Sequence, residues 1–202
     1  IFGAPMAHPD HAARSCLTAL EMMEKLAELH PKWHEQGLPE LDIGIGVNTG
    51  PMSVGNMGSK VRFDYTVMGD NVNLGSRLEG INKQYGTNII ISEYTHNYAK
   101  EAIYARELDA VRVKGKREPV KIYELLGSGT PTDNHKQIMD NFHEALGYYR
   151  NQKWDDAIKL FNHVRTLKPE DFTSGVYISR CQAMSSQPPG PDWDGVFTMT
   201  TK

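Results

Sequence analysis

Hydrophobic and polar residues follow a helical period in several parts of the chain. Over residues 10–36, apolar side chains recur at helical spacing; Asp10 stands at the N-cap position and Gly37 follows as a stop signal. The same spacing returns over residues 72–85 and ends before Gly86. A shorter helix is predicted after these, capped by Ser92 and Glu93 and running to about Lys100.

Other segments combine β-branched and aromatic residues, as strands do. Extended runs are predicted over residues 41–47 and 52–57, and the turn-forming tripeptide 48–50 between them predicts a hairpin. The glycines of this region are explained by the same hairpin geometry. Further extended runs lie at residues 62–68, 88–91, 103–113 and 120–126. The order of strands and helices predicts an α+β or α/β sandwich.

The pattern changes after residue 126. Residues 127–131 combine Gly, Ser, Thr and Pro and predict a linker. The segment that follows is helical, and small and aromatic residues fall at offsets typical of a tetratricopeptide repeat: Ala145, Tyr148, Ala157, Phe161 and Pro169. One such repeat cannot bury its own apolar face, so we expect it to pack on the preceding domain or on another neighbour.

Composition narrows the class of protein. The 202 residues are 39% hydrophobic and 23% charged, which is typical of a soluble globular chain. A formal charge of −3 provides no basic field, so we predict no nucleic-acid partner. No run approaches the roughly 20 apolar residues of a membrane span, and no signal peptide is present. The two distant cysteines, Cys16 and Cys181, indicate a reducing compartment, and we predict a cytoplasmic location.

The residues that point to chemistry lie at the start of the helix predicted over 72–85. Asn73 and Arg77 are four residues apart and therefore project from one helix face near its N-terminal end, where free N–H groups and the helix dipole favour anions. A guanidinium matches phosphate geometry bidentately, so this face is suited to a phosphoryl group. The alternative is that Asn71 or Asn73 caps the helix and Arg77 is a solvated surface residue.

Five phrases in order and spacing resemble the class III adenylyl and guanylyl cyclase family. They are Ile-Gly-Ile-Gly-Val-Asn-Thr-Gly (43–50), Val-Gly-Asn-Met-Gly-Ser (54–59), Asp-Tyr-Thr-Val-Met-Gly-Asp-Asn-Val-Asn (64–73), Ser-Arg-Leu-Glu (76–79) and Val-Lys-Gly-Lys (113–116). The resemblance implies an α+β, ferredoxin-like cyclase sandwich without its N-terminal strands over residues 1–127. A linker at 128–134 and a tetratricopeptide-like helical tail at 135–202 complete the predicted organisation.

The resemblance also implies roles for individual residues. Asn73 corresponds to the ribose-orienting asparagine and Arg77 to the arginine that stabilises the transition state at the α-phosphate. Lys114 matches the lysine that contacts the β- and γ-phosphates, with Lys116 or a solvated turn lysine as alternatives. Thr66 occupies the purine-reading position, where it favours adenine, unless it is only a strand residue.

The metal ligands of the family fall outside this match. Two aspartates that hold two Mg²⁺ or Mn²⁺ ions lie on strands that precede the phrase Phe-Gly-Ala-Pro, so we expect them upstream of Ile1. Residues 1–5 predict the end of a buried strand, and we expect the natural chain to begin earlier. The fragment alone is then expected to be inactive. Family domains form head-to-tail dimers, which predicts a homodimer partner; an upstream sensor domain and a membrane anchor upstream are compatible with this sequence.

The resulting prediction is an adenylate cyclase that converts ATP to 3′,5′-cyclic AMP and pyrophosphate at sites between two subunits. A guanylate cyclase and a non-catalytic cyclase-like dimerisation module are the alternatives. A third is that the helices after residue 134 form a surface for a protein partner.

Overall fold

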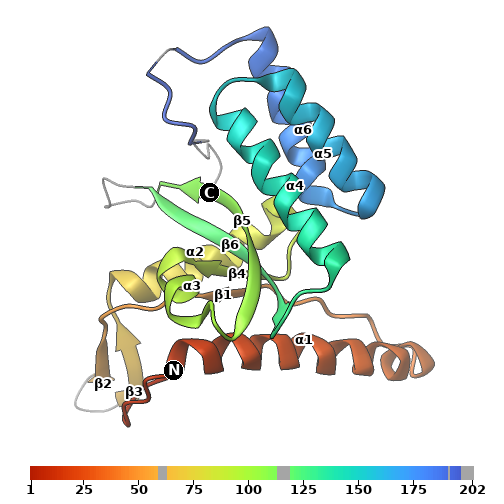
Figure 1. Cartoon of the computed structure of the whole chain (residues 1–202). Helices are drawn as coiled ribbons and strands as arrows, with labels where there is room; N and C mark the ends of the chain where they lie inside the picture. The colour runs from red at the N-terminus through yellow and green to blue at the C-terminus, as the bar shows by residue number, and fades with distance from the viewer. Residues whose placement is uncertain (59–62, 113–118, 191, 197–202) are drawn as a thin grey trace.

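The computed structural model describes residues 1–58, 63–112, 119–190 and 192–196. The chain forms a central sheet with helices packed on it, a separate two-stranded arm and a helical tail (Figure 1). The helices are α1 (His11–Glu35), α2 (Asp70–Tyr85), α3 (Glu93–Ala99), α4 (Asp133–Arg150), α5 (Trp154–Leu167) and α6 (Phe172–Ser186). The strands are β1 (Ile45–Val47), β2 (Ser53–Gly58), β3 (Phe63–Met68), β4 (Ile89–Ser92), β5 (Ile103–Val111) and β6 (Val120–Ser128). The prediction of an α+β fold is confirmed.

Four strands form the central sheet in the order β1-β4-β6-β5. β1 runs parallel to β4, whereas the β4–β6 and β5–β6 pairs are antiparallel. Within the part of the chain that the structure describes, β2 and β3 pair only with each other; they are antiparallel and project from the body as an arm (Figure 1). The sheet therefore combines β1, from the first predicted run, with the strands predicted late in the chain, and the arm contains the second and third predicted runs.

The predicted hairpin between residues 41–47 and 52–57 is wrong. β1 covers only Ile45–Val47 and pairs with β4, and the antiparallel partner of β2 is β3. The reason is that side chains around the predicted turn bind elsewhere: Asn48 contacts α2 and Ser92, and Thr49 lies 3.0 Å from the Thr95 hydroxyl. Turn-forming residues show that the chain changes direction, but tertiary contacts decide which strand it then meets.

The two faces of the sheet have different cores. Along β4, Ile89 and Ile91 face one side and Ile90 the other, as the two-residue period of a strand requires. The first side packs against small residues of α1 and α3, including Ala12, Cys16, Ala19 and Ala99. The second side packs against α2 and the helical tail, and this core is rich in aromatic residues.

α1 forms where the apolar periodicity predicts it, although its start differs in detail. Asp10 occupies the N-cap position but makes no capping bond; its carboxylate accepts a hydrogen bond from Arg14 Nε at 2.8 Å. Pro31 lies inside the helix, and Gly37 follows its end with φ +66°. Ile1 and Phe2 are exposed and belong to no strand, so the predicted buried strand end at residues 1–5 is wrong. Apolar residues alone do not form a strand, because each strand needs a neighbour to pair with.

The predicted helix ends after α1 are confirmed. Gly86 takes the left-handed conformation, with φ +63°, and its N–H donates to the Asn82 carbonyl at the end of α2. Ser92 caps α3 by accepting a hydrogen bond from the Thr95 amide at 3.3 Å. These caps satisfy backbone groups that a helix leaves without intrahelical partners.

The tail packs on the preceding domain, which is one of the two outcomes expected of it. Helices α4, α5 and α6 lie side by side next to the sheet (Figure 1). Phe142, Tyr149, Phe161 and Tyr177 are completely buried and stack or meet edge to face with ring centres 4.9–5.8 Å apart. The same core contains Leu74, Leu78, Ile90 and Leu108, so it is continuous between the tail and the cyclase-like part.

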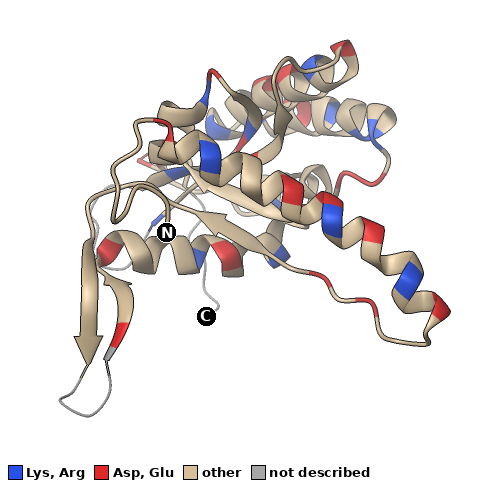
Figure 2. Cartoon of the chain, turned by 90° about the horizontal axis from the view of Figure 1, so that it is seen from below, with Lys and Arg blue, Asp and Glu red and all other residues tan. Residues whose placement is uncertain are grey.

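Charge is distributed without a single-sign face along α1, where Lys and Arg are interspersed with Glu (Figure 2). The β2–β3 arm differs: Asp64 is the charged residue in the sequences of its two strands. Among the helices that the structure describes, none combines the length and apolar character needed to cross a bilayer.

Candidate functional site

The candidate site is built on the first half of α2, which lies unusually close to β1. A Cβ atom at Gly46 would overlap the backbone carbonyl of Gly75 and the amide of Glu79, so only glycine allows this approach. Gly46 therefore serves helix–strand packing. The prediction that hairpin geometry explains the glycines of this region is wrong at this position.

Side-chain amides hold the start of α2 in place. Asn48 Nδ2 donates to the Asn71 carbonyl at 2.9 Å, and Asn71 Nδ2 donates to the Pro51 carbonyl at 2.8 Å. Asn48 Oδ1 in turn accepts a hydrogen bond from the Ser92 hydroxyl at 2.6 Å. These bonds connect α2 to the ends of β1 and β4. The N-cap is Gly69 and receives no side-chain bond, so capping does not explain Asn71 or Asn73.

Asn73 and Arg77 are both exposed and project from one face of α2, one helical turn apart. The buried stripe of the same helix, which includes Leu74, Leu78 and Ile81, faces the core. The two side chains thus combine a rigid helical backbone with access to a ligand. Because the helix dipole is positive at this end, the face favours an anionic group such as a phosphate.

Thr66 is not brought onto this helix face. Thr66 lies in the middle of β3, opposite Gly55 of β2, and is half-buried. It therefore belongs to the arm. Lys114 and its alternative Lys116 fall outside the described residues. Of the four residues predicted for the substrate, the structure brings together Asn73 and Arg77.

A cleft of about 840 Å³ lies beside the site, between the N-terminal segment, α1, β1, the arm and α2. α2 contributes Asn71, Val72, Gly75 and Ser76 to its lining, which is the helix face next to that of Asn73 and Arg77. The described residues that line it include His8 and His11 but no Lys, Arg, Asp or Glu. The cleft is a mostly apolar space and not itself a phosphate site.

The described residues do not form a metal-binding site. They contain no group of three or more His, Cys, Asp or Glu side chains that could hold an ion. The two cysteines are buried, and burial raises the pKa of Cys16 to about 11 and that of Cys181 to about 12. Both thiols are therefore protonated near neutral pH and are poor metal ligands.

Sequence reasoning missed the residues that position α2. The tripeptide 48–50 predicts a turn at Asn48, and nothing in the local sequence indicates that this residue binds α2. Asn82 had a detectable signal, because it falls at helical spacing between Leu78 and Tyr85 in an otherwise apolar stripe. It is 2% exposed, and its Nδ2 donates to the Ile45 carbonyl at 3.1 Å.

The family model of adenylate and guanylate cyclase catalytic domains matches residues 1–127. The chain belongs to this family. The match ends where the helical tail begins, so α4, α5 and α6 lie outside it.

Individual relatives agree with this family. Adenylate cyclase 1 of Rhizobium meliloti (strain 1021) is 39% identical over 127 residues, which cover 63% of this chain and 19% of that protein. The chain thus spans about a fifth of the length of this relative.

Solved structures agree as well. The guanylyl cyclase Cya2 has a TM-score of 0.57 and 37% identity, with 65% of this chain and 66% of that chain covered. The adenylyl cyclase CyaB from P. aeruginosa has a TM-score of 0.57 and 33% identity, with 65% and 67% covered. The mixed α+β fold of residues 1–127 is therefore that of class III cyclases.

Proposed function

We propose that this chain is part of an adenylate cyclase, which converts ATP to 3′,5′-cyclic AMP and pyrophosphate. The observation that carries the proposal is the pairing of Asn73 and Arg77 on one exposed face of α2 in a chain of the cyclase family. The adenylate cyclase of Rhizobium meliloti supports ATP as the substrate.

In this reaction the ribose 3′-oxygen attacks the α-phosphorus in line, and the bond from that phosphorus to the pyrophosphate oxygen breaks. The 3′-hydroxyl loses its proton, and pyrophosphate leaves. The Arg77 guanidinium donates hydrogen bonds to the α-phosphate oxygens as negative charge develops on them. Asn73 orients the ribose, and Thr66 on the arm contacts the adenine. Lys114 contacts the β- and γ-phosphates.

We also propose two Mg²⁺ or Mn²⁺ ions as cofactors. When bound, they would activate the 3′-hydroxyl and stabilise the leaving group. The described residues contain no fitting cluster. The proposal follows the cyclase family in placing the ligands upstream of Ile1, and we assign no step on this chain to the metals.

A homodimer is part of the same proposal, because the β2–β3 arm needs a partner. A two-stranded hairpin is only marginally stable alone in water. This arm pairs with no other strand among the described residues, and Tyr65 and Met68 on it are 54% and 58% exposed. A second subunit would cover these side chains and bring its own groups to the face of Asn73 and Arg77.

A guanylate cyclase is the second candidate, because the likeness to Cya2 is as strong as the likeness to CyaB. A partner-binding role for the tail, based on its tetratricopeptide-like spacing, is compatible with either activity.

The test is to incubate the full-length protein with Mn²⁺ and either ATP or GTP and to identify the product by mass spectrometry. Cyclic AMP formed from ATP supports the proposal. Cyclic GMP formed from GTP in preference to cyclic AMP from ATP would favour the guanylate cyclase. No cyclic product from either nucleotide would contradict both and favour a non-catalytic module.

A further inference from the structure

Strand β5 is tied to the helical tail by three ion pairs. Each of three neighbouring strand residues meets an oppositely charged residue of the tail, with nitrogen–oxygen distances of 2.6–2.7 Å. The pairs are Arg106 with Asp171, Glu107 with Arg150 and Asp109 with Arg180. The strand members of these pairs are at most 7% exposed. Because separating these pairs would leave buried charges without partners, they favour this position of the tail on the strand.

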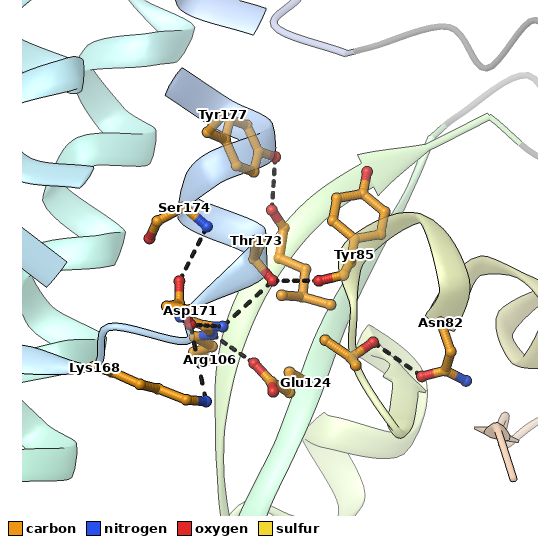
Figure 3. A network of polar contacts seen from close by, with 11 residues as sticks. Asn82, Tyr85, Arg106, Glu124, Lys168, Asp171, Thr173, Ser174 and Tyr177 are labelled. Atoms are coloured by element: carbon orange, nitrogen blue, oxygen red, sulfur yellow. Dashed lines mark hydrogen bonds and ion pairs between the residues drawn. The ribbon is translucent and has the colours of Figure 1, made fainter. Parts of the chain in front are cut away.

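Two residues of the tail, Thr173 and Arg180, contact the C-terminal end of α2. The Tyr85 hydroxyl donates to Asp109 Oδ2 at 2.5 Å, and Arg180 lies against the same carboxylate, with its Nη2 3.3 Å from the Tyr85 hydroxyl. Thr173 Oγ1 donates to the Tyr85 carbonyl at 2.8 Å (Figure 3). This carbonyl is one of the last four of α2, which lack intrahelical partners, so the tail supplies the missing bond.

α2 connects this contact to the candidate site. Tyr85 is the last residue of the helix and Arg77 lies eight residues before it, which is about 12 Å at the rise of an α-helix. Between them, Leu78 and Ile81 pack in the core and Asn82 is bound to β1. A shift or rotation at the Tyr85 end therefore moves the whole helix, including the Arg77 side chain.

We propose that Thr173 and Arg180 of the tail are positioning residues for Arg77, acting through the C-terminal end of α2. The inference rests on the proposed cyclase function and adds to it a requirement from a segment outside the family match. A misplacement of about 1 Å is enough to cost about 100-fold in rate when geometry is tightly required. If the tail only filled the core, loss of the Thr173 hydroxyl would leave the rate of the folded enzyme unchanged.

The first test is Thr173→Val in the full-length protein, which keeps the shape of the side chain. It removes the hydroxyl that donates to the Tyr85 carbonyl at 2.8 Å and accepts a longer bond of 3.4 Å from Arg106 Nη2. We expect kcat to fall by about tenfold, a part of the penalty for full misplacement, with KM for ATP unchanged. Thr173→Ser keeps the hydroxyl and should restore kcat. Ser179→Ala is the matched control, because Ser179 is exposed on the same helix and bonds only to Gly175 one turn before it; its kcat should equal that of wild type.

The outcomes separate this inference from the proposed function. A wild-type protein that makes no cyclic nucleotide overturns both. An active wild type whose folded Thr173→Val variant keeps full kcat, or changes KM alone, overturns the positioning role and leaves the cyclase intact. If Thr173→Val does not fold, Arg180→Lys takes its place, since it keeps the charge opposite Asp109 and shortens the reach to the Tyr85 hydroxyl; unchanged kcat there likewise overturns the inference.

Discussion

Helix α2 has polar side chains in two settings, exposed in its first half and buried near its C-terminal end. Asn73 and Arg77 in the first half are exposed to solvent. Asn82 and Tyr85 near the end are 2% and 0% exposed, and each is hydrogen-bonded to another part of the chain. The same helix therefore offers polar groups to a ligand at one end and uses them for internal contacts at the other.

The difference shows how a site gains accuracy. The position of a long exposed side chain such as Arg77 depends on the backbone beneath it, and buried contacts hold that backbone. α2 has such contacts at its start, through Asn48 and Asn71, and at its end, through Tyr85. Substitutions at the two ends should therefore separate stability from catalysis.

The largest effect on stability is expected from Arg106→Met. Arg106 lies on β5, in the buried polar network next to the C-terminal end of α2. The Arg106 side chain is 3% exposed, contacts Glu124 and Asp171 at 2.6 Å and lies 4.5 Å from the centre of the Phe142 ring. Its removal takes the cation from Glu124 and leaves Asp171 with only the longer contact to Lys168 at 3.9 Å. Removing one partner of a similar buried pair costs about 3–5 kcal/mol. Urea denaturation measures the change in the free energy of unfolding.

Arg112→Met provides the matched control for that substitution. Arg112 pairs with Asp194, but both side chains are almost half exposed, so the expected loss is about 0–1 kcal/mol. Equal losses for the two variants would show that burial does not distinguish these ion pairs.

Arg77→Ala tests the exposed polar face in the first half of α2. We expect turnover of the full-length protein to fall by about 10²–10³-fold, since one donor to the developing charge is lost. The free energy of unfolding should stay within about 0.5 kcal/mol of wild type, as for other exposed positions. ATP binding should survive, because the lost interaction belongs mainly to the transition state.

Lys83→Ala, an exposed change in the last turn of α2, should alter neither rate nor stability. Kinetics and urea denaturation of both variants check this pair. If Arg77→Ala weakened ATP binding and turnover equally, the assignment of Arg77 to the transition state would be wrong.

The smallest effect is expected from acid, through Asp171. Burial alone would raise the pKa of this carboxyl, but the adjacent Arg106 guanidinium outweighs burial and holds the pKa below its usual value. A lowered folded pKa contributes stability that is fully present above the unfolded value, about pH 4, and is lost as the pH falls through the folded pKa. The effect is smaller than that of Arg106→Met because Glu124 still pairs with Arg106.

The measurement is the free energy of unfolding between pH 6 and pH 3, compared between wild type and Asp171→Asn. Wild type should lose its advantage over the variant as the pH falls below about 4. A constant difference over this range would contradict the role of the Asp171 charge.

Much of the local structure was predictable, and the reasons are local. The apolar stripe with Leu74, Leu78 and Ile81 predicted α2, and Gly86 and Ser92 marked helix ends that the structure confirms. The spacing of Asn73 and Arg77 placed both on one helix face in advance. The role of each in binding nucleotide stays a prediction, as do those of Thr66 and Lys114.

The pairing of strands was not predictable in the same way. Residues 48–50 have a turn composition, yet β1 pairs with β4, more than forty residues later along the chain. The three ion pairs between β5 and the tail also join residues that are 43–71 positions apart. Neither contact leaves a periodic signal in the sequence.

The sequence by itself determined the helices, their ends, the likeness to cyclases over residues 1–127 and the shared face of Asn73 and Arg77. All of these depend on side chains within a few turns of one another, where backbone geometry sets the spacing. Only the tertiary structure decided that the arm stands apart from the sheet and that the tail holds the end of α2. Such contacts depend on which distant surfaces fit and which buried charges find partners, and these are properties of the folded chain as a whole.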